Sequence, residues 1–140
     1  MNIAKIICNG RTYFSLYYYD ENIGHEVLLT KDGVILSFSS YNEALDYATS
    51  LGFEVASKIQ FDFDMEITSI VVGRDIIRKW NLITVMQGIF GIKTKYDLPE
   101  YDHLYNFIFD RSANEAVQIT LDKHYVALLK NVFCEAKEIF

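Results

Sequence analysis

Residues 39–66 read SSYNEALDYATSLGFEVASKIQFDFDME, and the spacing of their apolar residues changes once along the stretch. Ser40 is followed three residues later by Glu43, which is the order of a capping box at a helix start. The apolar residues that follow at helical spacing are Tyr41, Ala44, Leu45, Ala48 and Leu51. Gly52 suits the position just after a helix end. The pattern predicts an amphipathic helix over 41–51.

From Phe53 onward, apolar and polar residues alternate, which is the period of a half-buried strand. The apolar members are Phe53, Val55, Ile59, Phe61, Phe63 and Met65, and the polar members are Glu54, Lys58, Gln60, Asp62, Asp64 and Glu66. We therefore expect a strand with a buried aromatic face. Asp62, Asp64 and Glu66 would point the same way from its outer face. Beyond Asp64 the apolar spacing also fits a short helix.

Short strands are predicted before the helix. Asn9-Gly10 separates an apolar run over 3–8 from a Tyr-rich run over 11–19, and Asn-Gly favours a two-residue hairpin turn. A loop leads into a third run over 25–30, and Asp32-Gly33 leads into a fourth over 34–38. Because these connections are short, the simplest topology is an antiparallel meander.

Helices are expected to dominate residues 71–140. An apolar run opens at Asp75 and ends at Gly91, and Trp80 lies among its isoleucines, which predicts a buried indole. Asp97-Leu98-Pro99-Glu100 is expected to start another helix, because Pro is tolerated in the first turn. A last helix is expected after a cap at Thr120, with a short extended segment at 117–119 before it. The element order predicts one α+β domain over residues 1–140. Its mainly antiparallel sheet, a meander of four to five strands, would carry helices packed on one face.

Composition supports a folded, cytoplasmic chain. The 140 residues are 51% hydrophobic, which excludes global disorder. No apolar run approaches the ~18 residues of a membrane span, and the first residues do not resemble a signal peptide. Cys8 and Cys134 are too few for a disulfide scaffold or a four-cysteine zinc site, so both are expected to be buried thiols.

The acidic residues are placed unevenly. The whole net charge of −6 lies in residues 1–70, which carry four basic and ten acidic residues; residues 71–140 carry nine of each. An acidic half disfavours nucleic-acid binding, because phosphates need cations. It suits a basic protein partner, although such an excess also serves solubility.

We expect neither a metal nor a cofactor, and no enzymatic activity. Three carboxylates on one strand face could hold Mg²⁺ or Ca²⁺, but no further ligand pattern accompanies them. His25, His103 and His124 lack metal-ligand spacing, and the chain contains no nucleophile elbow, phosphate loop or dinucleotide fingerprint. A partner-facing acidic stripe is the favoured interpretation.

The residues expected to bind that partner are Asp20, Glu21, Glu54, Asp62, Asp64, Glu66 and Tyr18. Tyr18 belongs to a block of three tyrosines in which Tyr17 and Tyr19 share one face of the strand. Such rings either pack on both faces of the sheet or face a partner, and at least one should face solvent unless a helix covers it.

Three segments carry a family resemblance. They are GVILSFSSYNEALDYA at 33–48, WNL at 80–82 and YDHLYNFIF at 101–109. In this order and spacing they resemble the small immunity proteins of bacterial contact-dependent growth inhibition, the CdiI type. The segment after Phe109 departs from the Asn-rich loop of such sequences.

The resemblance implies a cytoplasmic inhibitor that binds the C-terminal toxin domain of a large surface protein and blocks its active site. Such toxins are often basic nucleases, which an acidic inhibitor suits. Immunity proteins share no catalytic residues, so the resemblance assigns none here. The alternative is a small enzyme or ligand-binding domain whose site is assembled from dispersed residues such as His25, His103 and Tyr17.

Overall fold

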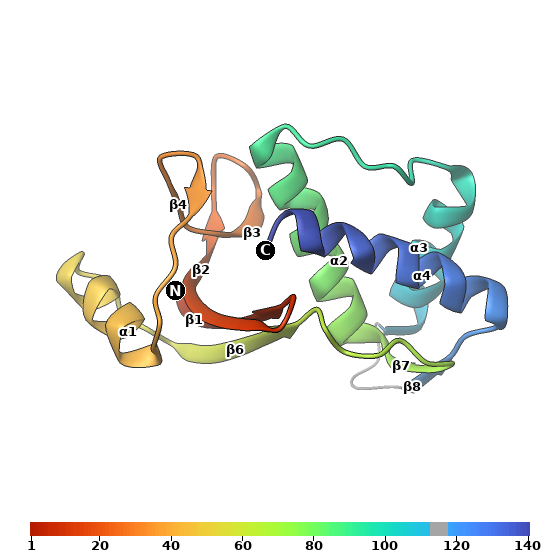
Figure 1. The fold of residues 1–140 in the computed structure, drawn as a ribbon, viewed down its shortest axis with the longest axis horizontal. Coiled ribbons are helices and arrows are strands. Elements are labelled where there is room, and N and C mark those ends of the chain that lie inside the picture. Colours follow the sequence, from red (N-terminus) through yellow and green to blue (C-terminus); the bar gives the residue numbers. More distant parts are fainter. Residues whose placement is uncertain (113–117) are drawn as a thin grey trace. The chain divides into compact units, whose positions relative to one another are not determined.

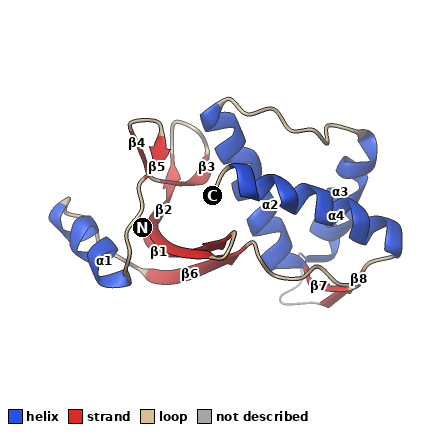
Figure 2. Ribbon diagram, in the orientation of Figure 1, coloured by secondary structure: helices blue, strands red, loops and turns tan. Residues whose placement is uncertain are grey.

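The computed structural model describes residues 1–112 and 118–140, which form two compact units (Figure 1). Unit 1 is Met1–Asp64 together with Phe140, and unit 2 is Met65–Ile139. Unit 1 holds β1 (Asn2–Cys8), β2 (Arg11–Asp20), β3 (His25–Leu28), β4 (Thr30–Lys31), β5 (Val34–Ile35), α1 (Tyr41–Ser50) and β6 (Ser57–Asp62). Unit 2 holds β7 (Ile70–Val72), α2 (Gly73–Phe90), α3 (Pro99–Ser112), β8 (Gln118–Thr120), α4 (Lys123–Cys134) and the 3₁₀ helix η1 (Glu135–Glu138). The predicted α+β class is confirmed (Figure 2).

The sheet of unit 1 has the strand order β3-β2-β1-β6. β1–β2 and β2–β3 are antiparallel hairpins, as predicted, and Asn9 and Gly10 both take the positive φ that the tight turn requires. The turn predicted at Asp32-Gly33 also forms, because β4 pairs antiparallel with β5. These two strands make a separate sheet, however, so the predicted four-strand meander is wrong. The fourth strand of the main sheet is β6, which lies parallel to β1. The connection through α1 makes this possible, since parallel strands need a long crossover.

α1 confirms the helix predicted at 41–51 to within one residue. The Ser40 hydroxyl accepts a hydrogen bond from the Glu43 amide at 3.2 Å. The Glu43 carboxylate accepts from the Ser39 amide and hydroxyl, at 3.1 and 2.9 Å, rather than from Ser40. Ala44 and Ala48 are buried with Ile3 and Leu16, so small helix residues bring α1 close to one face of the sheet.

The opposite face of the sheet is aromatic. Phe61 on β6 is fully buried and packs edge-on against Tyr17 of β2, with ring centroids 5.1 Å apart. Phe63 follows in the chain and stacks on Phe140 at 4.5 Å. Phe61 and Phe63 are therefore buried as predicted, although Phe63 lies just beyond the strand. The prediction was wrong at its two ends, because Phe53 and Met65 are exposed and β6 spans only Ser57–Asp62.

Several predictions in unit 2 need correction. The segment at 70–72 is strand β7, paired with β8, rather than a helix, and α2 begins at Gly73. Thr120 belongs to β8; the cap of α4 is Asp122, whose carboxylate accepts from the Tyr125 amide at 2.7 Å. The extended segment expected at 117–119 is seen from Gln118 onward, and Val117 lies outside the described residues.

Trp80 is not a core residue. Its indole is half-buried, and the neighbouring Lys79 is the buried side chain, 2% exposed. Lys79 tolerates burial because its ammonium pairs with the Asp75 carboxylate one helical turn earlier, at 2.7 Å. Trp80 instead lines a pocket, so the space beside its indole is not filled by packed core.

Candidate functional site

The predicted acidic stripe does not form. β6 ends at Asp62, and the chain then turns, so Asp62, Asp64 and Glu66 do not alternate along one strand. The Asp62 carboxylate accepts from the Asp64 amide at 3.0 Å, a bond typical of a turn. The turn replaces the strand because Asp side chains bond locally to backbone amides two residues on.

Asp64 has a structural role. Its two carboxylate oxygens accept from the Asn9 amide at 2.7 Å and from the Gly10 amide at 2.8 Å. These are the two central residues of the β1–β2 hairpin, where both take a positive φ. The carboxylate therefore fixes the turn from a position 54 residues further along the chain.

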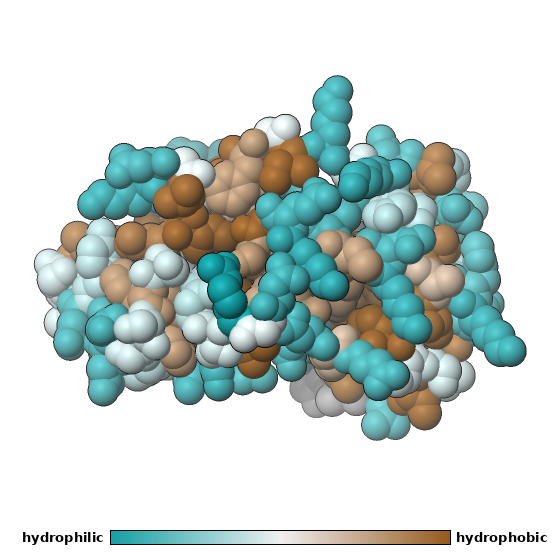
Figure 3. Space-filling view, viewed as in Figure 1, coloured by the Kyte–Doolittle hydropathy of each residue, from teal (hydrophilic) through white to brown (hydrophobic). Residues whose placement is uncertain are grey.

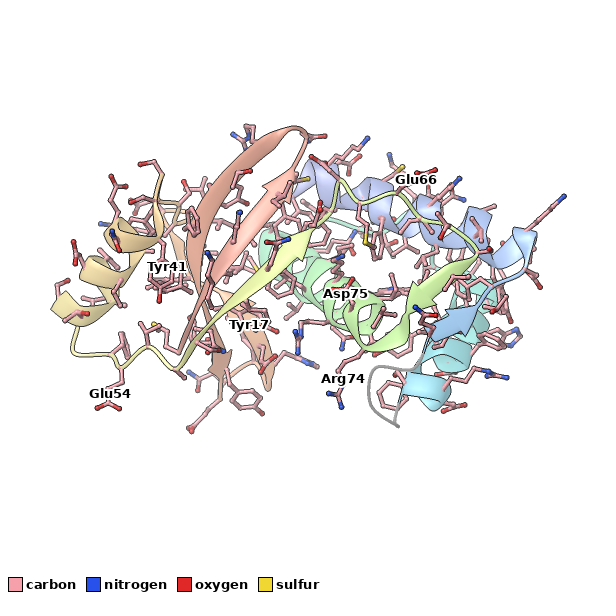
Figure 4. All side chains as sticks on the ribbon, turned by 90° about the horizontal axis from the view of Figure 1, so that it is seen from below. Tyr17, Tyr41, Glu54, Glu66, Arg74 and Asp75 are labelled. Carbon is pink, nitrogen blue, oxygen red and sulfur yellow. The ribbon has the colours of Figure 1, made fainter. Side chains whose placement is uncertain are left out.

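The loop after β2 is organised in the same way. The Asp20 carboxylate accepts from the amides of Asn22 at 2.9 Å and Ile23 at 3.2 Å, which closes the turn. Glu21 and Glu54 are exposed, and Glu54 points away from the segment after α1 (Figure 4). Of the predicted partner residues in unit 1, Glu21 and Glu54 are thus exposed without a turn role.

The three tyrosines of β2 have different surroundings. Tyr17 is buried and its hydroxyl donates to the Glu26 carboxylate. Tyr18 is half-buried, and this burial raises the pKa of its hydroxyl, with the nearby Asp20 charge adding to the effect. Tyr19 is 60% exposed, so one ring of the block faces solvent as predicted.

Carboxylates in unit 1 lack internal cations. No ion pair joins a Lys, Arg or His to an Asp or Glu within Met1–Asp64; the three pairs in the described chain lie in unit 2. Glu66, the remaining predicted site residue, is exposed at the start of unit 2 (Figure 4). The negative charge of unit 1 is therefore left for solvent or a partner to balance.

Unit 2 contains a pocket of about 190 Å³ that the sequence did not predict. Its lining residues come from α2, the α2–α3 connection, α3, α4 and η1; they are Trp80, Ile83, Thr84, Gln87, Thr94, Tyr96, Asp97, Tyr101, Asp102, Val132 and Glu135. Because five segments contribute, no local motif marks the site. Among the lining residues, only Trp80 had been singled out from the sequence, and it had been predicted to lie in the core.

Aromatic rings form much of the wall. Tyr96 and Tyr101 lie against one another with ring centroids 5.1 Å apart, tilted by 36°. The Asn131 amide donates to the Tyr101 hydroxyl at 3.1 Å, which fixes that ring. Trp80 is supported from outside the pocket by Tyr105, edge-on at 5.3 Å. The wall is thus built from rings that neighbouring side chains hold in place.

The floor holds a buried carboxylate. Glu135 is 6% exposed and accepts from the Gln87 side-chain amide, from the Thr94 hydroxyl at 2.7 Å and from the Lys95 amide at 3.1 Å. These bonds satisfy a group whose burial would otherwise be costly. They also tie η1 to α2 and to the α2–α3 connection, so Glu135 shapes the pocket.

Two more carboxylates stand at the rim. Asp97 and Asp102 are exposed, and within the described ranges neither forms an ion pair. Lysine and arginine are absent from the pocket lining. Aromatic rings on the wall and carboxylates at the rim are the groups that attract cations in proteins.

The residues named for the alternative hypothesis, an enzyme or ligand-binding site, do not come together within either unit. His25 is exposed on β3 in unit 1, and His103 is exposed on α3 in unit 2. His124 lies 3.3 Å from the Glu100 carboxylate at the surface. Across 1–112 and 118–140, no three His, Cys, Asp or Glu side chains gather as metal ligands do. Cys8 is buried as predicted, whereas Cys134 is exposed.

Apolar side chains are also exposed. Figure 3 shows apolar surface over the β4–β5 ribbon, where Val34 is 62% exposed. In unit 2, Phe109 is 52% exposed and stacks on Tyr105 at 6.0 Å. None of the helices in the described part of the chain is long and apolar enough to cross a bilayer.

Comparisons with known proteins bear on the fold alone. Neither a family model nor a curated protein matches the chain. Among solved structures it is similar to the C-terminal domain of SatS, crystallised in complex with bromine, with a TM-score of 0.56. The match covers 99% of this chain and 89% of that domain at 12% identity, so it supports the arrangement of elements and assigns no activity.

Proposed function

We propose that this protein is a toxin-neutralising immunity protein. It binds a basic, nuclease-type toxin domain in the cytoplasm and blocks that domain's active site, without catalysing a reaction itself. The observation that carries the proposal is the acidic unit 1, whose carboxylates have no Lys, Arg or His partner within Met1–Asp64. The resemblance of residues 33–48, 80–82 and 101–109 to such proteins supports it.

Electrostatics explains how such a surface would act. Exposed carboxylates such as Glu21 and Glu54 attract a basic partner before contact and so raise the association rate. A nuclease active site is itself rich in cations, because it binds phosphates. An acidic protein can therefore occupy the substrate's place.

The direct test begins with the gene immediately upstream, which the proposal expects to end in a toxin domain. We expect the two purified proteins to form a complex in gel filtration, and the toxin's activity to fall in proportion to the amount of this protein added. Cells that produce both should grow. Absence of a complex together with unchanged toxin activity would contradict the proposal.

A further inference from the structure

We propose that the unit 2 pocket binds the guanidinium group of an arginine from the protein partner. This inference rests on the proposed function and names the chemistry of one contact. It concerns only residues of unit 2, from Trp80 on α2 to Glu135 on η1.

The wall of the pocket suits a flat cation. A guanidinium stacks on the faces of aromatic rings because the ring quadrupole has its negative side there, and Trp is the strongest partner. Trp80, Tyr96 and Tyr101 all line the pocket. Tyr101 is itself only 5% exposed and is held by Asn131, so its ring keeps one orientation.

The rim supplies the counter-charge. Asp97 and Asp102 line the same pocket and lack an ion pair within the described part of the chain. The nearby Lys95 ammonium pairs with Glu138 at 3.3 Å, so it is turned to a different carboxylate. An incoming cation would therefore meet negative charge without displacing an internal one.

Shape favours arginine over lysine. Arginine presents five donors in a rigid plane that matches a carboxylate, and its guanidinium is less strongly hydrated than an ammonium. The pocket volume of about 190 Å³ admits one side chain rather than a folded segment. Anions are disfavoured because no lysine or arginine lines the pocket.

The only tryptophan makes binding directly measurable. Since Trp80 lines the pocket, its fluorescence should report a ligand stacked beside it. The probe is N-acetyl-arginine amide, titrated into the full chain, with the neutral N-acetyl-citrulline amide as its isostere and N-acetyl-lysine amide as the second cation. We expect a saturable change with the arginine probe at a Kd of about 1 mM, the range for one side chain, a weaker one with lysine and none with citrulline.

Substitutions distinguish binding in the pocket from a general effect of the protein's negative charge. Asp97→Asn with Asp102→Asn should weaken the arginine probe at least about tenfold, and Tyr96→Leu should weaken it while keeping apolar bulk. Asp110→Asn, the same change further along α3 outside the lining, should leave the Kd unchanged. Circular dichroism confirms that each variant is folded.

Several outcomes would overturn the inference. Equal responses to the arginine and citrulline probes would show that the pocket does not recognise a positive charge. Tighter binding of the lysine probe would show that it does not prefer a guanidinium. A Kd of about 1 μM for the free probe would mark a small-molecule site instead of a partner contact. These tests need no toxin, so they fail or succeed apart from the proposed function. In the toxin complex, the Asp97→Asn, Asp102→Asn double variant should shorten the lifetime, and an unchanged lifetime would contradict a partner arginine in this pocket.

Discussion

Asp64 shows how one residue can carry a structural role that its sequence neighbours hide. It stands in an acidic alternation, yet its carboxylate binds the Asn9 and Gly10 amides of a distant hairpin. The alternation identified a strand but could not reveal the role of Asp64 beyond its end, because the two amides that Asp64 binds are brought to it only by folding. Charge in a pattern is therefore weak evidence of an interface.

Removing this carboxylate should destabilise the protein. Asp64→Ala leaves two turn amides without their acceptor and should lower the free energy of unfolding by about 1–2 kcal/mol. Glu54→Ala is the matched control, because Glu54 is exposed and its substitution should stay within about 0.5 kcal/mol. Urea denaturation measures both. Equal urea midpoints for the two variants would show that the Asp64 carboxylate does not stabilise the hairpin turn.

Tyr13 should make stability depend on alkaline pH. Burial raises the pKa of its hydroxyl above the ordinary 10.0; Cys8 adds to the rise and the Arg11 guanidinium opposes it. The folded state therefore favours the neutral phenol. Its contribution to stability is complete below the unfolded pKa and is lost as pH rises through the window above it, because the unfolded chain ionises first.

Tyr13→Phe cannot ionise in either state. Between about pH 8 and pH 10.5 the variant should lose about 0.5–1 kcal/mol less unfolding free energy than the wild-type protein. Tyr19→Phe, at a 60% exposed position, should lose as much as the wild-type protein. Chemical denaturation at the two pH values checks this, and parallel losses in all three proteins would contradict a raised pKa of the half-buried Tyr13 hydroxyl.

At the scale of elements, local signals predicted more than long-range ones. The Ser40 cap, the Asn9-Gly10 turn and most of the α1 face were predicted correctly, because each depends on residues close in sequence. Leu51 was placed on that face wrongly, since it is 51% exposed at the helix end. The parallel placement of β6 beside β1 was missed, since strand pairing across α1 leaves no local trace. The prediction that Trp80 lies in the core was wrong, because periodicity shows which face of a helix is apolar but not whether other elements fill the space beside it. The pocket was missed since five segments build it.

The two glycines of α2 should respond oppositely to alanine. A Cβ on Gly73 would lie 2.5 Å from Ile119 Cδ1 and 3.0 Å from Ser112 Cβ, so Gly73→Ala should destabilise by about 1–3 kcal/mol. At Gly88 no atom lies within 4 Å, and Gly88→Ala should stabilise by about 0.5–1 kcal/mol through higher helix propensity. Thermal melting compares them. A Gly73→Ala protein as stable as Gly88→Ala would show that the close packing of α2 on α3 and β8 is wrong.

At the scale of the molecule, charge and aromatic surface are divided between the units. Unit 1 carries carboxylates without internal cations, and unit 2 carries the ring-lined pocket. The sequence alone predicted the acidic character of unit 1, because charged residues can be counted along a chain. We assign the carboxylates of unit 1 to attraction of a basic partner and the pocket of unit 2 to one specific contact. Attraction acts on the association rate and specific contacts act on the lifetime of a complex.

Association kinetics with the neighbouring toxin domain test the central claim most directly. Glu21→Lys with Glu54→Lys reverses two exposed charges and spares the turn carboxylates of Asp20 and Asp64. Stopped-flow at low and high salt should show the double variant associating about tenfold more slowly at low salt, with the difference shrinking at high salt. Its melting temperature should match that of the wild-type protein. Equal association rates at both salt concentrations would contradict electrostatic recognition of a basic toxin by unit 1.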